Sequence, residues 1–542
     1  MALELIDLTI VGIYAVVLFA MANWVSREKA GHQKDAEDYF LAGKTLPWWA
    51  VGASLIASNI SAEQIIGQSG QGYVVGLAIA AYEWQAAIVL LLVAKYFLPI
   101  FLDRKIYTMP QFLDSRFGGA IKNIMAAFWI ALYTAVNLTA ILWLGALAIN
   151  AVTGFPIWPA MAGLAAFAVL YSIYGGLKAV ALTDLVQVVV LIAGGIAITW
   201  ISLALVGQGA GPAAGFATLM GEIPGHFKMI LEPEHPQYQN LPGIWTLLGG
   251  LWVLHFSYWG FNQYIIQRAL GAKSLAEAQK GLAFAASLKL LIPVIVVVPG
   301  IAALYLVQNG LLDGTAMEAR PDSTYGVLMT LVPGGLRGLV FAALIAAIVS
   351  SLASMMNSIS TIFTMDIYRS VVKDKPDGHY VTVGRITALS AMVIALILAQ
   401  PFLGGLESAF QTIQEYSGFV APGVVAVFLL GLFWQRANTA GAFAMLFASV
   451  GLSVILKIIT VVGGDSASVL GVNLATLPFV VRIWIVFLAC LVAGVVVSIL
   501  TPKPSEEQVV VLGKLDFATG PIFNIAAISI IVTLILIYVI YW

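Results

Sequence analysis

Charged residues and cysteine are scarce in this 542-residue chain, and each shortage excludes a class of protein. Charged side chains make up 10% of the sequence, against about 25% in a typical soluble domain. The 26 basic and 27 acidic residues leave a formal net charge of −1, which gives no electrostatic basis for binding nucleic acid. Cys490 is the one cysteine, so neither an internal disulfide nor a cysteine-based metal site is expected.

Hydrophobic residues are abundant instead, at 61% of the chain, and the mean hydropathy is +0.96. Apolar runs long enough to cross a hydrocarbon core of ~30 Å recur along the sequence. We therefore predict an all-α polytopic membrane protein whose first run, with Glu4 and Asp7 in place of a basic signal region, is a retained span. The fourteen predicted transmembrane helices cover residues 5–25, 46–69, 73–102, 120–151, 157–175, 180–206, 244–267, 277–308, 337–365, 382–401, 407–434, 438–461, 478–500 and 521–541.

Basic residues concentrate in the loops on one side of the predicted membrane, and that side is expected to be cytoplasmic. Both termini are then extracytoplasmic. The opposite side holds Lys228, Arg320, Arg337 and Arg482. The predicted cytoplasmic loops hold Arg27, Lys29, Lys34, Lys44, Arg104, Lys105, Arg116, Lys122, Lys178, Arg268, Lys273, Lys280, Arg369, Lys373, Lys375, Arg385, Arg436, Lys503 and Lys514.

The stretch from Leu46 to Leu91 has an unusual polar content for a pair of membrane spans. Residues 58–64 (Ser-Asn-Ile-Ser-Ala-Glu-Gln) interrupt the first apolar run, and Glu83 lies deep in the next one. Hydrocarbon offers such groups no hydrogen-bond partner, so they should face a cavity or a pathway. We predict a substrate and ion site at a break in a membrane helix.

A second interrupted span follows five spans later, where 244–267 contains Gly249-Gly250, His255, Ser257 and Gly260. An offset of five inverts the second helix, and paired discontinuous helices in inverted halves are typical of alternating-access transporters. The glycine pair alternatively serves close helix packing. The predicted organisation is a peripheral helix and loop (1–45), a first five-span repeat (46–206), an extracytoplasmic loop (207–243), a second five-span repeat (244–434) and three peripheral helices (435–542).

Several short motifs do not indicate an enzyme. Gly43-Lys44-Thr45 resembles the end of a phosphate-binding loop, but Asp38 occupies the required first glycine position. The glycine-rich segment 67–72 is predicted to be a tight turn outside the membrane. The five histidines show no metal-ligand spacing, and no nucleophile–base set is evident, so no enzymatic activity is predicted.

A cation site is predicted where the broken helix meets the span 337–365. A hard cation prefers oxygen ligands, and a helix break releases carbonyls, here those of Ala57 and Ile60. Ala347, Ser350 and Ser351 are spaced i, i+3 and i+4, which places them on one helical face. Alternatively, the serine hydroxyls bond back to the preceding turn of their own helix.

Polar side chains within the predicted spans define a candidate pocket. Glu83 and Lys289 either contact a solute there or neutralise each other as a structural pair. Together with nearby aromatic rings, the pocket suits a neutral polyhydroxylated ligand, since no arginine is expected in mid-membrane to meet a carboxylate. The polar candidates are Asn59, Gln64, Glu83, Lys289, Gln411 and Gln414, and the aromatic ones are Tyr82, Tyr258, Trp259 and Phe410.

Asp184 lies at the predicted cytoplasmic start of the span 180–206. With Thr183 it makes a good helix N-cap, where a carboxylate is stabilised. It could equally serve as a waypoint for a cation between the ion site and the cytoplasm.

Long blocks of the sequence resemble the solute:sodium symporter family, in its sodium/glucose cotransporter group, and most closely its bacterial galactose-transporting branch. The resemblance extends over most of the chain and is least specific after about Val461. The blocks are DYFLAGKTLPWWAVGASLIASNISAEQIIG from Asp38, YSIYGGLKAVALTDLVQVV from Tyr171, YWGFNQYIIQRAL from Tyr258, AAIVSSLASMMNSISTIFTMDIY from Ala346, and FQTIQEYSGFVAPG from Phe410.

The resemblance implies a LeuT-type five-plus-five inverted-repeat fold and Na⁺-coupled uptake of a hexose-like sugar by alternating access. It also implies a bacterial inner-membrane location and a monomer or weak oligomer, with Na⁺ as the coupling ion. By resemblance, sodium contacts fall on Ala57, Ile60, Ala347, Ser350 and Ser351, with Asp184 on the ion exit path. Sugar contacts fall on Asn59, Gln64, Glu83, Lys289 and Gln414, the inner gate on Tyr258, and the outer lid on Tyr82 and Phe410.

Three positions depart from the galactose-transporting pattern of that family. His255, a candidate sugar contact, replaces an asparagine, Ala86 replaces a serine, and Gln68 replaces an outer-gate methionine. The alternatives are a Na⁺- or H⁺-coupled symporter of another neutral solute such as inositol or a nucleoside, or a sensor or passive channel. Short tails disfavour a sensor, and the bulky Tyr258 disfavours a channel.

Overall fold

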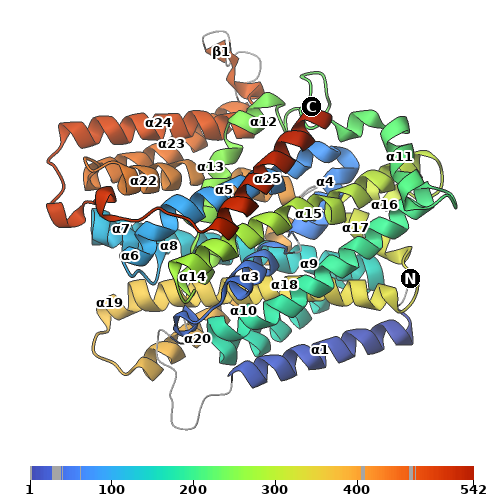
Figure 1. Cartoon of the computed structure of the whole chain (residues 1–542), viewed down its shortest axis with the longest axis horizontal. Coiled ribbons are helices and arrows are strands. Elements are labelled where there is room, and N and C mark those ends of the chain that lie inside the picture. Colours follow the sequence, from blue (N-terminus) through green and yellow to red (C-terminus); the bar gives the residue numbers. More distant parts are fainter. Residues whose placement is uncertain are drawn as a thin grey trace.

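The computed structural model describes residues 3–26, 38, 41–61, 63–404, 409–462, 468–469 and 472–542. Figure 1 shows these residues as a bundle of helices, with α1 along one flank and α22, α23 and α24 gathered at one end. The predicted loop residues Arg27, Lys29 and Lys34 lie outside the described residues.

The first half of the chain is built from helices whose lengths follow the apolar runs, with short 3₁₀ and π-helical turns between or within them. In order they are α1 (Leu5–Ser26), η1 (Ala42–Lys44), α3 (Trp48–Asn59), η2 (Glu63–Gly67), α4 (Gln68–Val74), η3 (Leu77–Ala80), α5 (Ala81–Leu92), η4 (Val93–Phe97), α6 (Leu98–Asp103), α7 (Met109–Phe117), α8 (Gly119–Leu132), η5 (Tyr133–Leu138), α9 (Thr139–Thr153), α10 (Ile157–Val206), α11 (Pro212–Glu222) and η6 (Pro224–Phe227).

The second half continues in the same way and adds one small antiparallel hairpin, β1 with β2, to an otherwise helical chain. Its elements are α12 (Ile244–Leu248), α13 (Leu251–His255), η7 (Phe256–Gly260), α14 (Gln263–Leu270), α15 (Leu275–Gln308), α16 (Thr315–Ala319), η8 (Pro321–Ser323), α17 (Thr324–Thr330), α18 (Leu336–Ile362), η9 (Phe363–Tyr368), α19 (Arg369–Val371), α20 (Asp377–Leu403), α21 (Ala409–Ser417), α22 (Ala421–Phe433), α23 (Thr439–Val462), β1 (Ser468–Val469), β2 (Val472–Asn473), η11 (Leu474–Thr476), α24 (Phe479–Leu500), η12 (Glu506–Gln508), η13 (Leu512–Lys514) and α25 (Pro521–Ile540).

Nine helices in the described part of the chain are long and apolar enough to cross a membrane, and three shorter apolar helices accompany them. The extent of burial shows which of these helices are central and which are peripheral. The most apolar stretch of Leu336–Val371 is 89% buried, while that of Pro521–Ile540 is 17% buried. The chain is therefore a multi-pass membrane protein in which α18 is central and α25 faces the surroundings.

The predicted pair of spans 157–175 and 180–206 is not present as two helices. One helix, α10, covers Ile157–Val206, so the loop expected at Lys178 is absent and the count of fourteen spans is not confirmed. No proline occurs between Ala160 and Val206, and a glycine pair alone does not end a helix. The short polar stretch around Lys178 was therefore wrongly interpreted as a loop.

The prediction of an exposed turn at residues 67–72 is also wrong. These residues continue the broken first helix through η2 into α4, and residues 68–72 are buried. Instead, the glycines allow α4 to approach the backbone of α15 closely, since a Cβ on Gly72 would lie 2.5 Å from the carbonyl oxygen of Val297 in α15. The second predicted helix thus extends to Val74 rather than ending at residue 69.

The span predicted at 407–434 is interrupted in the structure. Helix α21 ends at Ser417, a turn follows, and α22 begins at Ala421 with Pro422 in its first turn. The sequence contains the physical reason, because Gly418 and Pro422 flank the turn and proline cannot donate a helical hydrogen bond.

Asp7 of the first helix is fully buried and caps α18. Its Oδ1 accepts hydrogen bonds from the backbone N–H groups of Gly335 and Gly338, each at 2.8 Å, at the start of that helix. Because the first N–H groups of a helix lack internal partners, α1 thereby stabilises the central helix.

Candidate functional site

The break in the first core helix frees two backbone carbonyl groups. After α3 ends at Asn59, the N–H of Ser61 donates to Asn59 O at 2.8 Å, and the N–H of Gln64 donates to Ser61 O at 3.1 Å. In a continuous helix these donors would bond to the carbonyls of Ala57 and Ile60. Both predicted cation-binding carbonyls are thus left without their usual helical donor.

The serine face of α18 meets this break. Ser350 and Ser351 are fully buried, and Ser351 Oγ donates to Ser58 O of α3 at 3.0 Å. One turn further on, Ser354 Oγ lies 3.1 Å from Ser58 Oγ. The alternative that Ser351 bonds back to its own helix is wrong, since its hydroxyl bridges to α3. Ala347, one turn earlier on α18, is also buried.

Asp184 lies beside this serine face rather than at a helix start. It sits inside α10, fully buried, and accepts hydrogen bonds from Ser350 Oγ and, at 2.6 Å, from Ser54 Oγ. The N-cap interpretation is wrong because α10 continues through this position. A carboxylate that shares Ser350 with the predicted cation set is well placed to exchange a cation with it.

Arg268 was expected in a cytoplasmic loop, and that expectation is wrong. It lies in α14, fully buried, with Nε donating to Ser54 Oγ at 2.9 Å and Nη2 donating to Ser354 Oγ. Ser54 therefore links the guanidinium to Asp184. A signal was available, because the sequence between residues 263 and 270 is helix-forming and contains no turn residues.

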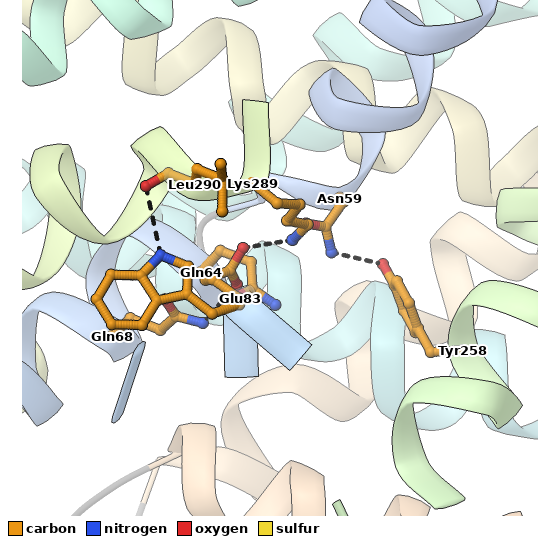
Figure 2. Close-up of polar contacts among 8 residues, drawn as sticks. Asn59, Gln64, Gln68, Glu83, Tyr258, Lys289 and Leu290 are labelled. Carbon is orange, nitrogen blue, oxygen red and sulfur yellow. Dashed lines mark hydrogen bonds and ion pairs between the residues drawn. The ribbon is translucent and has the colours of Figure 1, made fainter. Parts of the chain in front are cut away.

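Polar side chains from five helical segments, α3, α4, α5, η7 and α15, meet next to the break (Figure 2). Lys289 of α15 forms an ion pair with Glu83 of α5 and also donates to Asn59 Oδ1. Gln68 Nε2 donates to Glu83 Oε1 at 2.7 Å, and Asn59 Nδ2 donates to the hydroxyl of Tyr258 at 3.2 Å. Glu83 and Lys289 are each 1% exposed, so both charges are removed from water. The hydrogen bonds from these neighbours help to offset that desolvation cost.

A cavity opens against this network. Nine predicted residues line it, namely Asn59, Gln64, Tyr82, Glu83, His255, Tyr258, Trp259, Lys289 and Gln414. Glu83 and Lys289 therefore form a pair that also faces the cavity. Asn137 and Asn262 also line the cavity and were missed in the sequence, whereas Ser61 belongs to the predicted polar interruption at 58–64. The side chain of Gln411 lies outside the described residues.

Tyr82 lines the cavity and packs against Phe410. Tyr82 and Phe410 are 6% and 0% exposed, and their ring centroids lie 5.4 Å apart in an edge-to-face arrangement. Tyr258 also lines the cavity and is partly exposed, and Lys289 Nζ lies 4.7 Å above the centroid of Trp259.

The three departures from the galactose-transporting pattern occupy different surroundings. His255 lines the cavity, and its Nε2, like the hydroxyl of the neighbouring Tyr82, has no hydrogen-bond partner among the described residues. Gln68 supports Glu83. Ala86 is fully buried and is not among the described residues that line the cavity.

Comparisons with known proteins agree with this architecture. The sodium/glucose cotransporter of Vibrio parahaemolyticus is 48% identical over 551 aligned residues, covering 100% of this chain and 99% of the relative. The sodium/myo-inositol cotransporter 2 of Sus scrofa is 32% identical and covers 84% of this chain and 70% of the relative. A solved Na⁺-coupled sialic acid symporter, in a substrate-bound outward-open state, matches with a TM-score of 0.77 at 23% identity, over 93% and 99% of the two chains.

The last match confirms the predicted LeuT-type all-helical fold. The model of the sodium:solute symporter family matches residues 39–449, which include every predicted site residue. The predicted family is confirmed, and the chain belongs to the sodium:solute symporter family.

Proposed function

We propose that the protein takes up a hexose-like sugar together with Na⁺ by alternating access. The chain is a transporter rather than an enzyme, as its family is. The observation that carries the proposal is the break after α3. It leaves the carbonyls of Ala57 and Ile60 available on one side, and it places Asn59 in the cavity wall on the other.

The sodium ion is assigned to the oxygens of Ala57, Ile60, Ala347, Ser350 and Ser351, which come from α3 and α18. Ser351 already bridges these two helices through Ser58 O at 3.0 Å. An ion shared by both helices would stabilise the arrangement in which they are close. Its release through Asp184, which contacts Ser350, would loosen that arrangement and so lower the affinity for sugar.

The sugar is assigned to the cavity bounded by Asn59, Gln64, Glu83, Lys289 and Gln414, with His255 as an additional contact. These groups supply both donors and acceptors, which a ring of hydroxyls requires. Tyr258 is assigned as the inner gate. Tyr82, Phe410 and Gln68 are assigned as the outer lid. The names of the two relatives favour hexoses first and inositol second.

The location and orientation of the chain in the membrane are also assigned. We propose a bacterial inner-membrane location with both termini extracytoplasmic, and two inverted repeats over residues 46–206 and 244–434. In that orientation the lid formed by Tyr82 and Phe410 faces outward.

Uptake into proteoliposomes tests the function directly. Purified protein would be given radiolabelled glucose, galactose and myo-inositol under inward gradients of Na⁺, Li⁺ or choline. Concentrative uptake of a hexose with Na⁺, but not with choline, is expected. Uptake that is equal in Na⁺ and choline would overturn sodium coupling, and uptake of inositol alone would reassign the solute.

A further inference from the structure

Helix α21 carries the lid over the cavity. Ile413, Gln414 and Ser417 line the cavity, and Phe410, one turn earlier, packs on Tyr82 at a centroid distance of 5.4 Å. The helix has nine residues and is separated from α22 by a turn, so it can move relative to α22 as a short unit.

Glu415 ties this short helix to the peripheral helices. Its Oε1 accepts a hydrogen bond from Lys457 Nζ of α23 at 2.8 Å and another from Arg482 Nη2 of α24 at 2.7 Å. The three side chains, Glu415, Lys457 and Arg482, are 21%, 34% and 13% exposed, so water screens them only in part. Helices α23 and α24 lie side by side at one end of the molecule (Figure 1).

The guanidinium of Arg482 is itself held in place by α23. Arg482 Nη1 donates to Thr460 Oγ1 at 3.2 Å, and Thr460 Oγ1 donates to the carbonyl of Lys457 at 2.7 Å. Directly after α21, Gly418 lies so close to α24 that a Cβ there would meet Ile483 Cδ1 at 2.4 Å. The end of α21 is thus packed on α24 as well as paired with it.

We propose that Glu415, Lys457 and Arg482 form a positioning cluster that holds α21 against α23 and α24 and thereby favours the closed lid. This inference rests on the proposed function, in which the solute passes under that lid. Glu415 offers one carboxylate to two cations, so its neutralisation removes both of the ion pairs that attract α21 to α23 and α24. The lid-closed conformation then loses stability relative to a conformation in which α21 has moved away.

Thiol labelling measures the position of the lid directly. A Ser417→Cys reporter, in a chain whose buried Cys490 is replaced by alanine, places one thiol in the cavity wall beneath the lid. A membrane-impermeant thiol reagent is applied to intact cells in Na⁺ buffer. Adding Glu415→Gln is expected to raise the labelling rate about fivefold or more, because the open-lid population increases. The maximal uptake rate is expected to fall.

Charge exchange and a matched control complete the test. The double variant Glu415→Arg with Arg482→Glu restores one ion pair across the same contact, and it should bring labelling back toward the parent rate. Glu232→Gln, which removes the exposed Lys228–Glu232 pair at 2.7 Å, should change nothing. If Glu415→Gln is labelled at the parent rate, or if the double variant is no better than the single one, the cluster does not position the lid.

Two further variants test the role of the cluster if Glu415→Gln does not fold. Lys457→Met and Arg482→Met each remove one donor and leave Glu415 paired with the other, so each should raise labelling by a smaller amount. Unchanged labelling in both would overturn the proposal. Labelling needs no sugar transport, so a parent chain without Na⁺-dependent uptake counts against the proposed function and not against the cluster.

Discussion

Single side chains at the break belong to two hydrogen-bond networks, one proposed to bind the ion and the other the solute. Ser351 is fully buried and bonds to Ser58 O, whereas Asn59 faces the cavity and bonds to Lys289 and Tyr258. Ser58 and Asn59, which are adjacent in the sequence, therefore belong to two different hydrogen-bond networks. A substitution in one network should affect its own ligand first.

Replacing Ser351 with alanine should weaken sodium binding while leaving the fold intact. The change removes one hydroxyl from the proposed ion site, and hydrogen bonds and contacts to charged partners contribute about 1.5–3 kcal/mol. The Na⁺ concentration for half-maximal uptake should therefore rise at least about tenfold. Ser287→Ala is the control, since Ser287 bonds back to Ala283 O of its own helix at 3.0 Å. Unchanged sodium dependence in Ser351→Ala would remove this residue from the ion site.

Replacing His255 with asparagine should change which sugar is preferred. His255 Nε2 lacks a partner among the described residues and lines the cavity, so a substrate hydroxyl can complete its hydrogen bonding. A change of hydroxyl partner should alter the ratio of KM values for glucose and galactose by about tenfold. Ala86→Ser is the control and should preserve the ranking. An unchanged ranking in His255→Asn would exclude contact with the sugar.

At the scale of elements, close backbone contact between α4 and α15 fixes the second half of the broken helix. Gly72 lies against Val297 O, and a Cβ on Gly300 would lie 2.2 Å from Ser69 O. These two contacts hold the segment that follows the break. They also explain why glycine-rich sequence is compatible with a buried helix here.

Substituting Gly72 with alanine should destabilise the protein by about 1–3 kcal/mol, the usual cost of an overpacked core. The added Cβ would lie 2.5 Å from backbone, which cannot move aside as a side chain can. Gly12→Ala is the control, because nothing lies within 4 Å of its Cβ position. Thermal unfolding in detergent should show a lower Tm for the first variant only, and equal Tm values would show that α4 can retreat from α15.

Much of the fold could be predicted from the sequence, because long apolar runs specify membrane helices by length alone. Predicted and observed limits agree closely for α1, α18, α23, α24 and α25. Prediction failed where helix-compatible polar residues were interpreted as loops, as at Lys178 and Arg268, and where glycine allowed contact rather than a turn. Pairings such as Arg268 with Ser54 and Ser354 depend on distant segments, which spacing along the chain does not reveal.

Across the whole molecule, peripheral helices support the core. Asp7 of α1 caps α18, and α23 and α24 hold Glu415 of α21. The two helices proposed to bind the ion, α3 and α18, lie near the centre, where burial is greatest. Ion binding in this position should stabilise the entire bundle.

Sodium should therefore raise the Tm of the purified protein. A ligand at a hundredfold excess over its Kd stabilises the folded state by about 2.7 kcal/mol. NaCl should shift the unfolding transition upward relative to choline chloride at equal ionic strength, and Ser351→Ala should reduce the shift. Equal Tm values in the two salts would argue against a specific sodium site.

The redirected hydrogen bonds at the break have a further consequence for how an ion is received. Ser61 and Gln64 satisfy their N–H groups on Asn59 and Ser61, so hydrogen bonds within the segment itself support its fold. In the proposed ion site, the oxygens of Ala57 and Ile60 are preorganised electron-pair donors, and little ordering entropy should be lost when a cation arrives. Sodium entry and exit can accordingly be fast, without local refolding at every transport cycle.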